Sequence, residues 1–238
     1  ANNANGGGGD GEYSIAGISA NSGQVITVFI DNETEDGVTV TRGAGSDIND
    51  ADIYQDMLIV RSEDGTATSN TNLDTAHNAD ADITAIYTDG TTTALTVASG
   101  KELHIWTGDL YTPGGNITAG GDIENNGTID ISTNAVTIAG NLDNASTWTD
   151  AAGASITFNG TAAQQVNIGG SAINSDIQNS NTSATVTVVT NTLNIGANDL
   201  TIDASAQLNT AGLNLTATGT FANNGTLGVN GSETITLT

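Results

Sequence analysis

The stretch NITAGGDIENNGTIDI, residues 116–131, recurs 98 residues later as NLTATGTFANNGTLGV, residues 214–229. The block Asn-Asn-Gly-Thr is identical in the two copies, and every apolar position of the first copy stays apolar in the second. A weaker copy of residues 121–129 follows 19 residues later, at residues 140–148. Self-similarity at a fixed spacing is the sequence signature of repeat architectures. The chain is therefore expected to repeat one short structural unit.

The spacing of apolar residues sets the size of this unit. From about residue 93 onward they recur every six to eight residues, so three steps make about 20 residues, and residues 93–238 hold roughly seven such units. A unit with three short strands and three turns is one coil of a right-handed parallel β-helix, an all-β solenoid. The 98-residue offset then corresponds to five coils. The expected stacks between coils are Ile117–Ile138–Phe158, Ile123–Leu142, Ile129–Trp148, Ile195–Leu215–Ile235, Ile202–Phe221 and Leu208–Leu227.

The Asn-Asn-Gly motifs are expected at the corners between strands. Asparagine and glycine tolerate the left-handed conformation better than other residues, and we expect the corners to need it. Stacked asparagine side chains are also expected to form hydrogen-bonded ladders from coil to coil. The motif is thus interpreted as corner chemistry, in place of a binding or modification site.

The first 92 residues are less regular. Residues 1–12 are rich in glycine and are expected to form a flexible tether. Residues 13–92 are expected to form an irregular β region, either the opening coils of the solenoid or a small capping β subdomain. Strands are predicted at residues 24–31, 37–42, 56–61, 82–88, 93–98 and 102–106, and residues 62–81 are predicted to form a polar loop. No helical apolar period persists over three turns, so helices are not expected.

The charge and composition exclude several classes of function. The chain carries 27 acidic and 3 basic residues, a formal net charge of −24. Nucleic acid binding needs lysine and arginine opposite the phosphates, so none is expected. No apolar run approaches the roughly 18 residues of a transmembrane helix, so membrane insertion is not expected. Cysteine is absent, which removes disulfides and thiolate metal sites.

A family resemblance accompanies the repeats. The Asn-Asn-Gly-Thr motifs and residues 158–168, FNGTAAQQVNI, resemble the degenerate β-helix repeats of large secreted bacterial surface proteins, such as haemagglutinin-like and autotransporter-type adhesins. Residues 103–115, LHIWTGDLYTPGG, resemble the leading coil of such repeats. The resemblance covers roughly residues 93–238. It implies an extracellular or cell-surface location and a structural or adhesive role, and it brings no family active site.

Residues for catalysis are scarce. The two histidines are His77, in the predicted polar loop, and His104, which alternates with apolar residues and is expected to face solvent on a strand. Polysaccharide lyases of this fold use a basic residue as proton acceptor, and the only lysine and arginine residues here are Arg42, Arg61 and Lys101. Glycoside hydrolases need clustered carboxylates, and no Asp-Asp pair occurs. We therefore predict that the protein is not an enzyme, with a polysaccharide-active enzyme as the least favoured reading.

Calcium is the one cofactor that the sequence suggests. Asn78, Asp80, Asp82 and Asp89 resemble positions 1, 3, 5 and 12 of a calcium-binding loop. Ile83 stands where such a loop needs glycine, which favours a solvated acidic loop over a calcium site.

Glycans are a second ligand class to consider. Trp106, Trp148 and Tyr111 lie near faces rich in threonine and asparagine, which suits carbohydrate binding. Aromatic residues in such positions are more often packed in a core.

The ends of a β-helix are open edges, and open edges favour association. The chain stops in mid-strand, so we expect either that it continues beyond Thr238 or that another subunit covers its last coil. The predicted inter-subunit residues are Tyr13, Ile15 and Ile18, on a strand that could be donated to a neighbour, and Ile235 and Leu237 on the last coil. The leading hypothesis is a structural subunit of an extracellular filament or cell-surface layer that binds copies of itself. The alternative is a stalk or adhesive segment of a larger adhesin.

Overall fold

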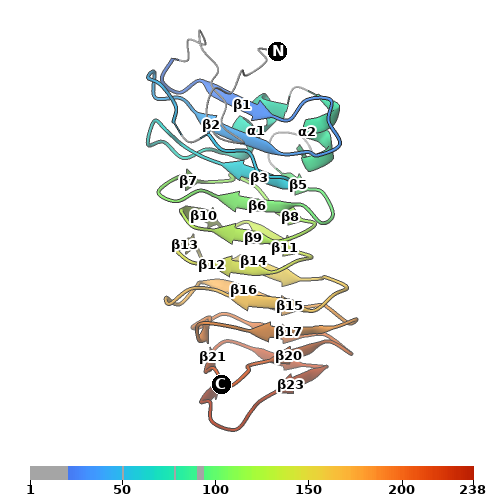
Figure 1. The fold of residues 1–238 in the computed structure, drawn as a ribbon. Coiled ribbons are helices and arrows are strands. Elements are labelled where there is room, and N and C mark those ends of the chain that lie inside the picture. Colours follow the sequence, from blue (N-terminus) through green and yellow to red (C-terminus); the bar gives the residue numbers. More distant parts are fainter. Residues whose placement is uncertain (1–20, 50, 78, 90–93) are drawn as a thin grey trace.

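A computed structural model describes residues 21–49, 51–77, 79–89 and 94–238. The protein is a β-solenoid of about nine turns, with successive turns about 20 residues apart, as the sequence predicted. Figure 1 shows the coils stacked into a rod, with both helices at one end and the C-terminus at the other. We call the end that carries the helices the capped end, and the end formed by the last coil the open end.

The coils have up to three faces, and the ten-stranded sheet is the first face. Its strands, in spatial order, are β1 (Val25–Phe29), β2 (Val38–Arg42), β3 (Met57–Val60), β6 (Glu102–Ile105), β9 (Ile123–Asn125), β12 (Leu142–Asn144), β15 (Gln164–Asn167), β17 (Thr185–Val188), β20 (Gln207–Asn209) and β23 (Thr226–Gly228). All neighbours pair in parallel except β1, which runs antiparallel to β2. β2 and β3 thus extend the same sheet as the later coils.

The second face is an eight-stranded sheet. Its strands are β4 (Tyr87–Asp89), β5 (Leu95–Val97), β8 (Ile117–Ala119), β11 (Ala135–Ile138), β14 (Ala154–Phe158), β16 (Ser175–Asn179), β19 (Leu200–Ile202) and β22 (Phe221–Asn223). It also begins with one antiparallel strand, since β4 runs antiparallel to β5. Each of the two long sheets therefore ends in a reversed strand at the capped end.

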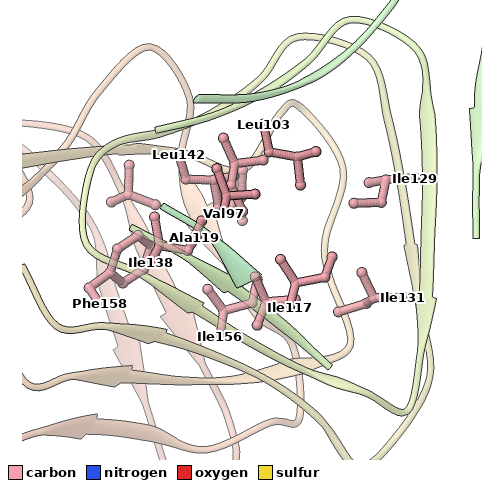
Figure 2. Close-up of a cluster of buried hydrophobic side chains, with 14 of the residues drawn as sticks. Val97, Leu103, Ile117, Ala119, Ile129, Ile131, Ile138, Leu142, Ile156 and Phe158 are labelled. Atoms are coloured by element: carbon pink, nitrogen blue, oxygen red, sulfur yellow. The ribbon is translucent and has the colours of Figure 1, made fainter. Parts of the chain in front are cut away.

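The third face consists of two short sheets. One holds β7 (Leu110–Tyr111), β10 (Thr128–Ser132) and β13 (Thr147–Asp150), and the other holds β18 (Leu193–Asn194), β21 (Leu215–Ala217) and β24 (Ile235–Leu237). The three faces enclose one continuous apolar core. In Figure 2, Leu103 and Leu142 from the first face, Phe158 from the second and Ile129 from the third point into this core.

Several of the predicted stacks are confirmed. Residues pair as predicted at Ile138–Phe158, Ile123–Leu142 and Ile129–Trp148. Leu215–Ile235 and Leu208–Leu227 also pair as predicted.

Three predicted stacks are wrong by two residues. Ile117 pairs with Val136 and not with Ile138, Leu215 pairs with Leu193 and not with Ile195, and Phe221 pairs with Leu200 and not with Ile202. A shift of two residues leaves a strand side chain on the same face. Apolar spacing alone therefore cannot distinguish the two registers.

The two copies of the 16-residue repeat occupy different faces. The first copy supplies β8, β9 and β10, on the second, first and third faces, whereas the second copy supplies β21, β22 and β23, on the third, second and first. The 98-residue offset therefore spans four and two-thirds coils and not the five expected. The repeated sequence therefore specifies a series of strands and the corners between them, and it does not specify which face each strand occupies.

The reason for glycine in these corners also differs from the prediction. Neither Gly127 nor Gly225 has a positive φ. A Cβ at Gly127 would collide with the carbonyl oxygens of Trp106 and Asp109, and one at Gly225 with the same kind of backbone oxygens. Glycine is required at both corners because the preceding coil approaches too closely for a side chain.

The predicted asparagine ladder is present inside one corner. The buried Asn125 side chain donates to Asn144 Oδ1 at 2.7 Å, and Asn144 donates in turn to the carbonyl of Ile168 at 2.8 Å. These hydrogen bonds pair the side-chain N–H groups of Asn125 and Asn144, which are buried between coils, where an unpaired polar group would be destabilising, whereas Asn125 Oδ1 has no hydrogen-bond partner.

Two helices correct the prediction that helices are absent. The predicted polar loop contains α1 (Asn70–His77), and the strand predicted at residues 82–88 is instead α2 (Ala81–Ile86) followed by β4. Ser69 and Asn72 exchange hydrogen bonds at the start of α1, and Asp80 caps α2 by accepting from the N–H of Asp82. Each helix has only about two turns, which is too short for a helical apolar period to stand out.

Candidate functional site

The open end presents the edges of all three faces. In the described residues, β22, β23 and β24 each pair with the preceding coil on one side and have no strand on the other. Figure 1 shows β23 and the C-terminus at this end of the rod.

Backbone groups on these edges point away from the rod. Leu200 and Leu215 donate to the carbonyls of Thr220 and Thr234, at 2.9 and 3.1 Å. The N–H on the other side of each of those peptide planes, at Phe221 and Ile235, faces the free edge because N–H and C=O of a trans peptide point in opposite directions. The open end therefore offers backbone hydrogen-bonding groups to an incoming strand.

Apolar side chains accompany these backbone groups. Phe221, Leu227, Ile235 and Leu237 pack against the core but remain half-buried, and Val229 is 51% exposed. None of the three edge strands contains a charged residue or a proline. Charged residues and proline protect many natural sheet edges, and both are absent from these three strands, each of which is three residues long.

The loop before β24 is held by one carboxylate. Glu233 accepts hydrogen bonds from the Thr210 hydroxyl at 2.5 Å and from the N–H groups of Asn230 and Ser232 at 2.6 and 2.9 Å. These bonds, led by the one from Thr210, lower the pKa of Glu233 to about 2.

The capped end is built differently. β1 and β4 close the two long sheets with reversed strands, and α1 packs on both of them. The Thr27 hydroxyl donates to the carbonyl of Ala76, and the buried Tyr87 hydroxyl donates to that of Leu73. The apolar ends of these sheets are therefore covered.

All three basic residues of the chain lie in this half and form ion pairs. Arg42 contacts Asp64 at 2.9 Å, Arg61 contacts Glu63 at 2.7 Å and Asp109 at 3.6 Å, and Lys101 contacts Asp56 and Asp36. Burial raises the pKa of Asp109, an effect that the Ser62 N–H and the Arg61 guanidinium oppose. Arg61, one of the three basic residues available to a lyase, is buried within these ion pairs.

The predicted inter-subunit residues fall into two groups. Tyr13, Ile15 and Ile18 lie outside the described residues. Ile235 and Leu237 lie on β24, on the free edge of the last coil.

The structure separates the predicted calcium ligands. Asn78 lies outside the described residues. Asp80 and Asp82 lie beside Asp31, with one carboxylate oxygen of each within 4.8 Å of the others. Asp89 instead faces Asp74 on α1, and burial together with the Asp74 carboxyl raises the pKa of Asp89.

Asp80 and Asp82 both serve local structure. Asp82 accepts from the N–H of Asn32 at 2.8 Å, which ties the β1–β2 turn to α2, and Asp80 is the α2 N-cap. These contacts explain the alternating acids at residues 80 and 82 without an ion.

Both histidines differ from their predicted settings. His77 ends α1, is half-buried, and its Nε2 lies 3.1 Å from the Tyr87 carbonyl. His104 points out of the ten-stranded sheet as expected but is only 8% exposed, because Glu102, Glu124 and the Trp106 ring surround it. Sequence alternation gives the direction of a strand side chain and not what covers it.

The aromatic residues considered for glycan binding do not present their rings together at the surface, although Tyr111 and Trp148 both lie on the third face. Tyr111 is buried, and its hydroxyl donates to Asn70. Trp106 stacks on Tyr54 at a centroid distance of 6.1 Å, and Trp148 lies on β13, half-buried. They do not form a continuous aromatic platform.

Comparison with known proteins finds no relative. No family model matches the chain, no curated protein matches it, and no solved structure matches it. Within the described ranges, neither helix is long or apolar enough to cross a membrane.

Proposed function

We propose that this chain is a structural subunit of an extracellular filament or cell-surface layer, and that copies associate through the open end. The observation that carries the proposal is the contrast between the ends: three uncharged strand edges at one, reversed strands and helices at the other. An exposed apolar edge is a template for strand pairing. The resemblance of the repeats to those of secreted surface proteins supports the extracellular setting.

The capped end favours one mode of association over another. Direct stacking of rods would place the last coil of one rod against β1, β4 and α1 of the next. β1 and β4 run antiparallel to the strands of the coils, and α1 packs on both of them. A donated strand avoids this obstacle. The alternating sequence of residues 13–18 follows a glycine-rich tether and suits such donation. Head-to-tail contacts that do not close into a ring give filaments.

The test compares the full chain with a chain lacking residues 1–18, by light scattering across a concentration series and by electron microscopy. We expect filaments from the full chain only. A peptide of residues 12–19 added in excess should shorten them. A full chain that stays monomeric at high concentration would overturn self-association, and unchanged filaments from the shortened chain would overturn strand donation.

Substitutions at Ile235 separate backbone pairing from apolar contact. Ile235→Pro removes an N–H that faces the free edge, whereas Ile235→Ala keeps the N–H and removes only apolar surface. We expect proline to abolish assembly and alanine to weaken it. Equal effects would show that backbone pairing at β24 does not contribute.

The second candidate is a stalk segment of a larger surface adhesin. The same open coil favours it, since a further coil of one polypeptide would pair with these edges as successive coils pair throughout the rod. This function predicts a monomer that binds a host surface or a glycan without assembling. Light scattering and a glycan array on the same sample distinguish the two.

A further inference from the structure

A separate group of side chains lies on the outer surface of the ten-stranded sheet, away from the open end. Glu102 and His104 are two residues apart on β6 and therefore point to the same side. Glu124 on β9 is the direct register partner of His104. Two neighbouring strands thus place two carboxylates and one imidazole side by side.

The distances converge on one nitrogen atom. His104 Nδ1 lies 3.2 Å from Glu102 Oε1 and 3.5 Å from Glu124 Oε2. The ligand atoms of the three residues all lie within 4.8 Å of one another. Ligands bound tetrahedrally to zinc at about 2.0–2.1 Å are about 3.3 Å apart, so the arrangement needs little change to accept an ion in place of the Nδ1 proton.

The surroundings hold the imidazole and leave one side accessible. The His104 side chain is 10% exposed, and the Trp106 ring lies beside it at a centroid distance of 5.3 Å. The Glu124 side chain is 38% exposed. A ligand fixed by packing on a regular strand loses little freedom on binding, and the glutamate side gives an ion its route from solvent.

We propose that Glu102, His104 and Glu124 bind one zinc ion, with water in the fourth position. Two carboxylates and a neutral imidazole balance the charge of Zn²⁺, and the net charge of −24 attracts cations to the surface. An imidazole ligand suits zinc, whereas calcium and magnesium take all-oxygen sites with more ligands. Bound zinc would link β6 to β9.

Asn126 supplies the outer contact of this site. Its Nδ2 donates to Glu124 Oε1 at 2.6 Å and lies 3.4 Å from His104 Nε2. With zinc on Nδ1, Nε2 carries the proton, so the Asn126 amide gives up its hydrogen bond to Glu124 and turns to place Oδ1 against Nε2. Such contacts to the second nitrogen orient a metal-bound histidine. One asparagine of the repeated motif is therefore a positioning residue for the ion.

The experiment titrates zinc into chelator-treated full-length protein by calorimetry, and replaces zinc with Co²⁺ to read coordination from its visible absorption. We expect one site, a tetrahedral Co²⁺ spectrum and a melting temperature that rises with zinc. His104→Gln and Glu124→Gln should abolish the spectrum, and Asn126→Ala should weaken affinity by about 10–100-fold. The matched controls are His77→Gln, at the other histidine, and Asp82→Asn, in the Asp31–Asp80–Asp82 cluster.

The variants keep the proposal open to refutation even if one of them folds poorly. Glu102→Gln and Glu124→Gln change one charge each on opposite sides of His104, and circular dichroism reports whether each variant is folded. Zinc binding that survives in folded His104→Gln would overturn the proposal. So would loss of binding in His77→Gln, or a wild-type protein that binds no zinc.

Discussion

The two ends of the rod differ in whether the edges of their sheets are covered. The capped end closes both long sheets with antiparallel strands, covers them with helices and holds the chain's three basic residues in ion pairs. The open end has parallel strands to its last coil and half-buried apolar side chains. In a solenoid each coil is stabilised only by its neighbours. In the described residues the last coil pairs with a neighbour on one side only, and its other side is free to pair with a further coil or with a partner.

The largest difference between the ends should come from matched leucine substitutions. Leu73 on α1 is fully buried in the cap, whereas Leu227 on β23 is half-buried. We expect Leu73→Ala to lower the free energy of unfolding by about 3 kcal/mol and Leu227→Ala by about 1 kcal/mol, since cost follows burial and the cavity left behind. Urea unfolding followed by circular dichroism measures both. Equal losses in the monomer would contradict the expectation that a half-buried leucine at the open end contributes less than a fully buried one in the cap.

Corner glycines provide the next comparison. Gly127 lies in an inner coil and its carbonyl accepts from the N–H of Thr147 in the next coil, whereas Gly225 belongs to the last coil. Alanine at either position collides with the preceding coil, but only the last coil is free to move away. We expect Gly127→Ala to destabilise by about 3 kcal/mol and Gly225→Ala by about 1 kcal/mol.

Thermal unfolding of both glycine variants gives the measurement, and Gly153→Ala is a useful control. A Cβ at Gly153 would meet no atom, so the only strain there is its positive φ of 98°. If the Gly225 variant proved as unstable as the Gly127 variant, the last coil would be as constrained as an inner one.

The solenoid was predictable from the sequence because its evidence is repeated many times. Apolar positions recur on every coil, and pairs such as Ile138–Phe158 follow from that spacing. The exact register was less predictable, since Ile117 stacks on Val136 two residues away from the expected partner. Side chains two residues apart on a strand point to the same face, so the apolar pattern is the same in both registers. The helices were missed because each occurs once, although Ile83 and Ile86, spaced by three, are buried together as in a helix and unlike a strand.

The candidate sites were less predictable because they depend on contacts between coils. His104 and Glu124 are 20 residues apart, and only their register on adjacent strands brings them together. The calcium prediction used neighbours along the chain, yet Asp82 lies beside Asp31 and Asp89 beside Asp74. Of the open end, the edge at Ile235 and Leu237 could be read from the sequence, but the reversed strands of the cap could not.

Acid should affect the two ends with opposite signs, and the capped end gives the larger response. Burial and the Asp74 carboxyl raise the pKa of Asp89, with His77 opposing them. A raised pKa means that the folded state favours the protonated form of Asp89. The contribution of the Asp74–Asp89 pair to stability is therefore greatest at low pH, and it is lost as pH rises through the folded-state pKa of Asp89. Asp74→Asn should therefore stabilise the protein at pH 7, by less than about 1 kcal/mol because Asp74 is exposed.

Melting temperatures of the Asp74→Asn variant and wild type between acidic and neutral pH measure this effect. The gain should shrink as pH falls and Asp89 becomes protonated in the wild type. Glu63→Gln, which removes an acid from an ion pair with Arg61, is a control expected to have the opposite sign at pH 7. A gain that grows at low pH would contradict the assignment.

The open end should show the smallest and most local effect. Hydrogen bonds from Thr210, Asn230 and Ser232 lower the pKa of Glu233 to about 2. A lowered pKa stabilises the fold above the unfolded-state pKa, and that contribution is lost as pH falls toward 2. Because Glu233 precedes only β24, Glu233→Gln should increase hydrogen exchange in residues 226–238 several-fold at pH 7 and leave the inner coils unchanged. The variant and wild type should converge at low pH. Faster exchange spreading to β20 and beyond would show that the last coil unfolds together with the rod, in which case the two ends would share one cooperative unit.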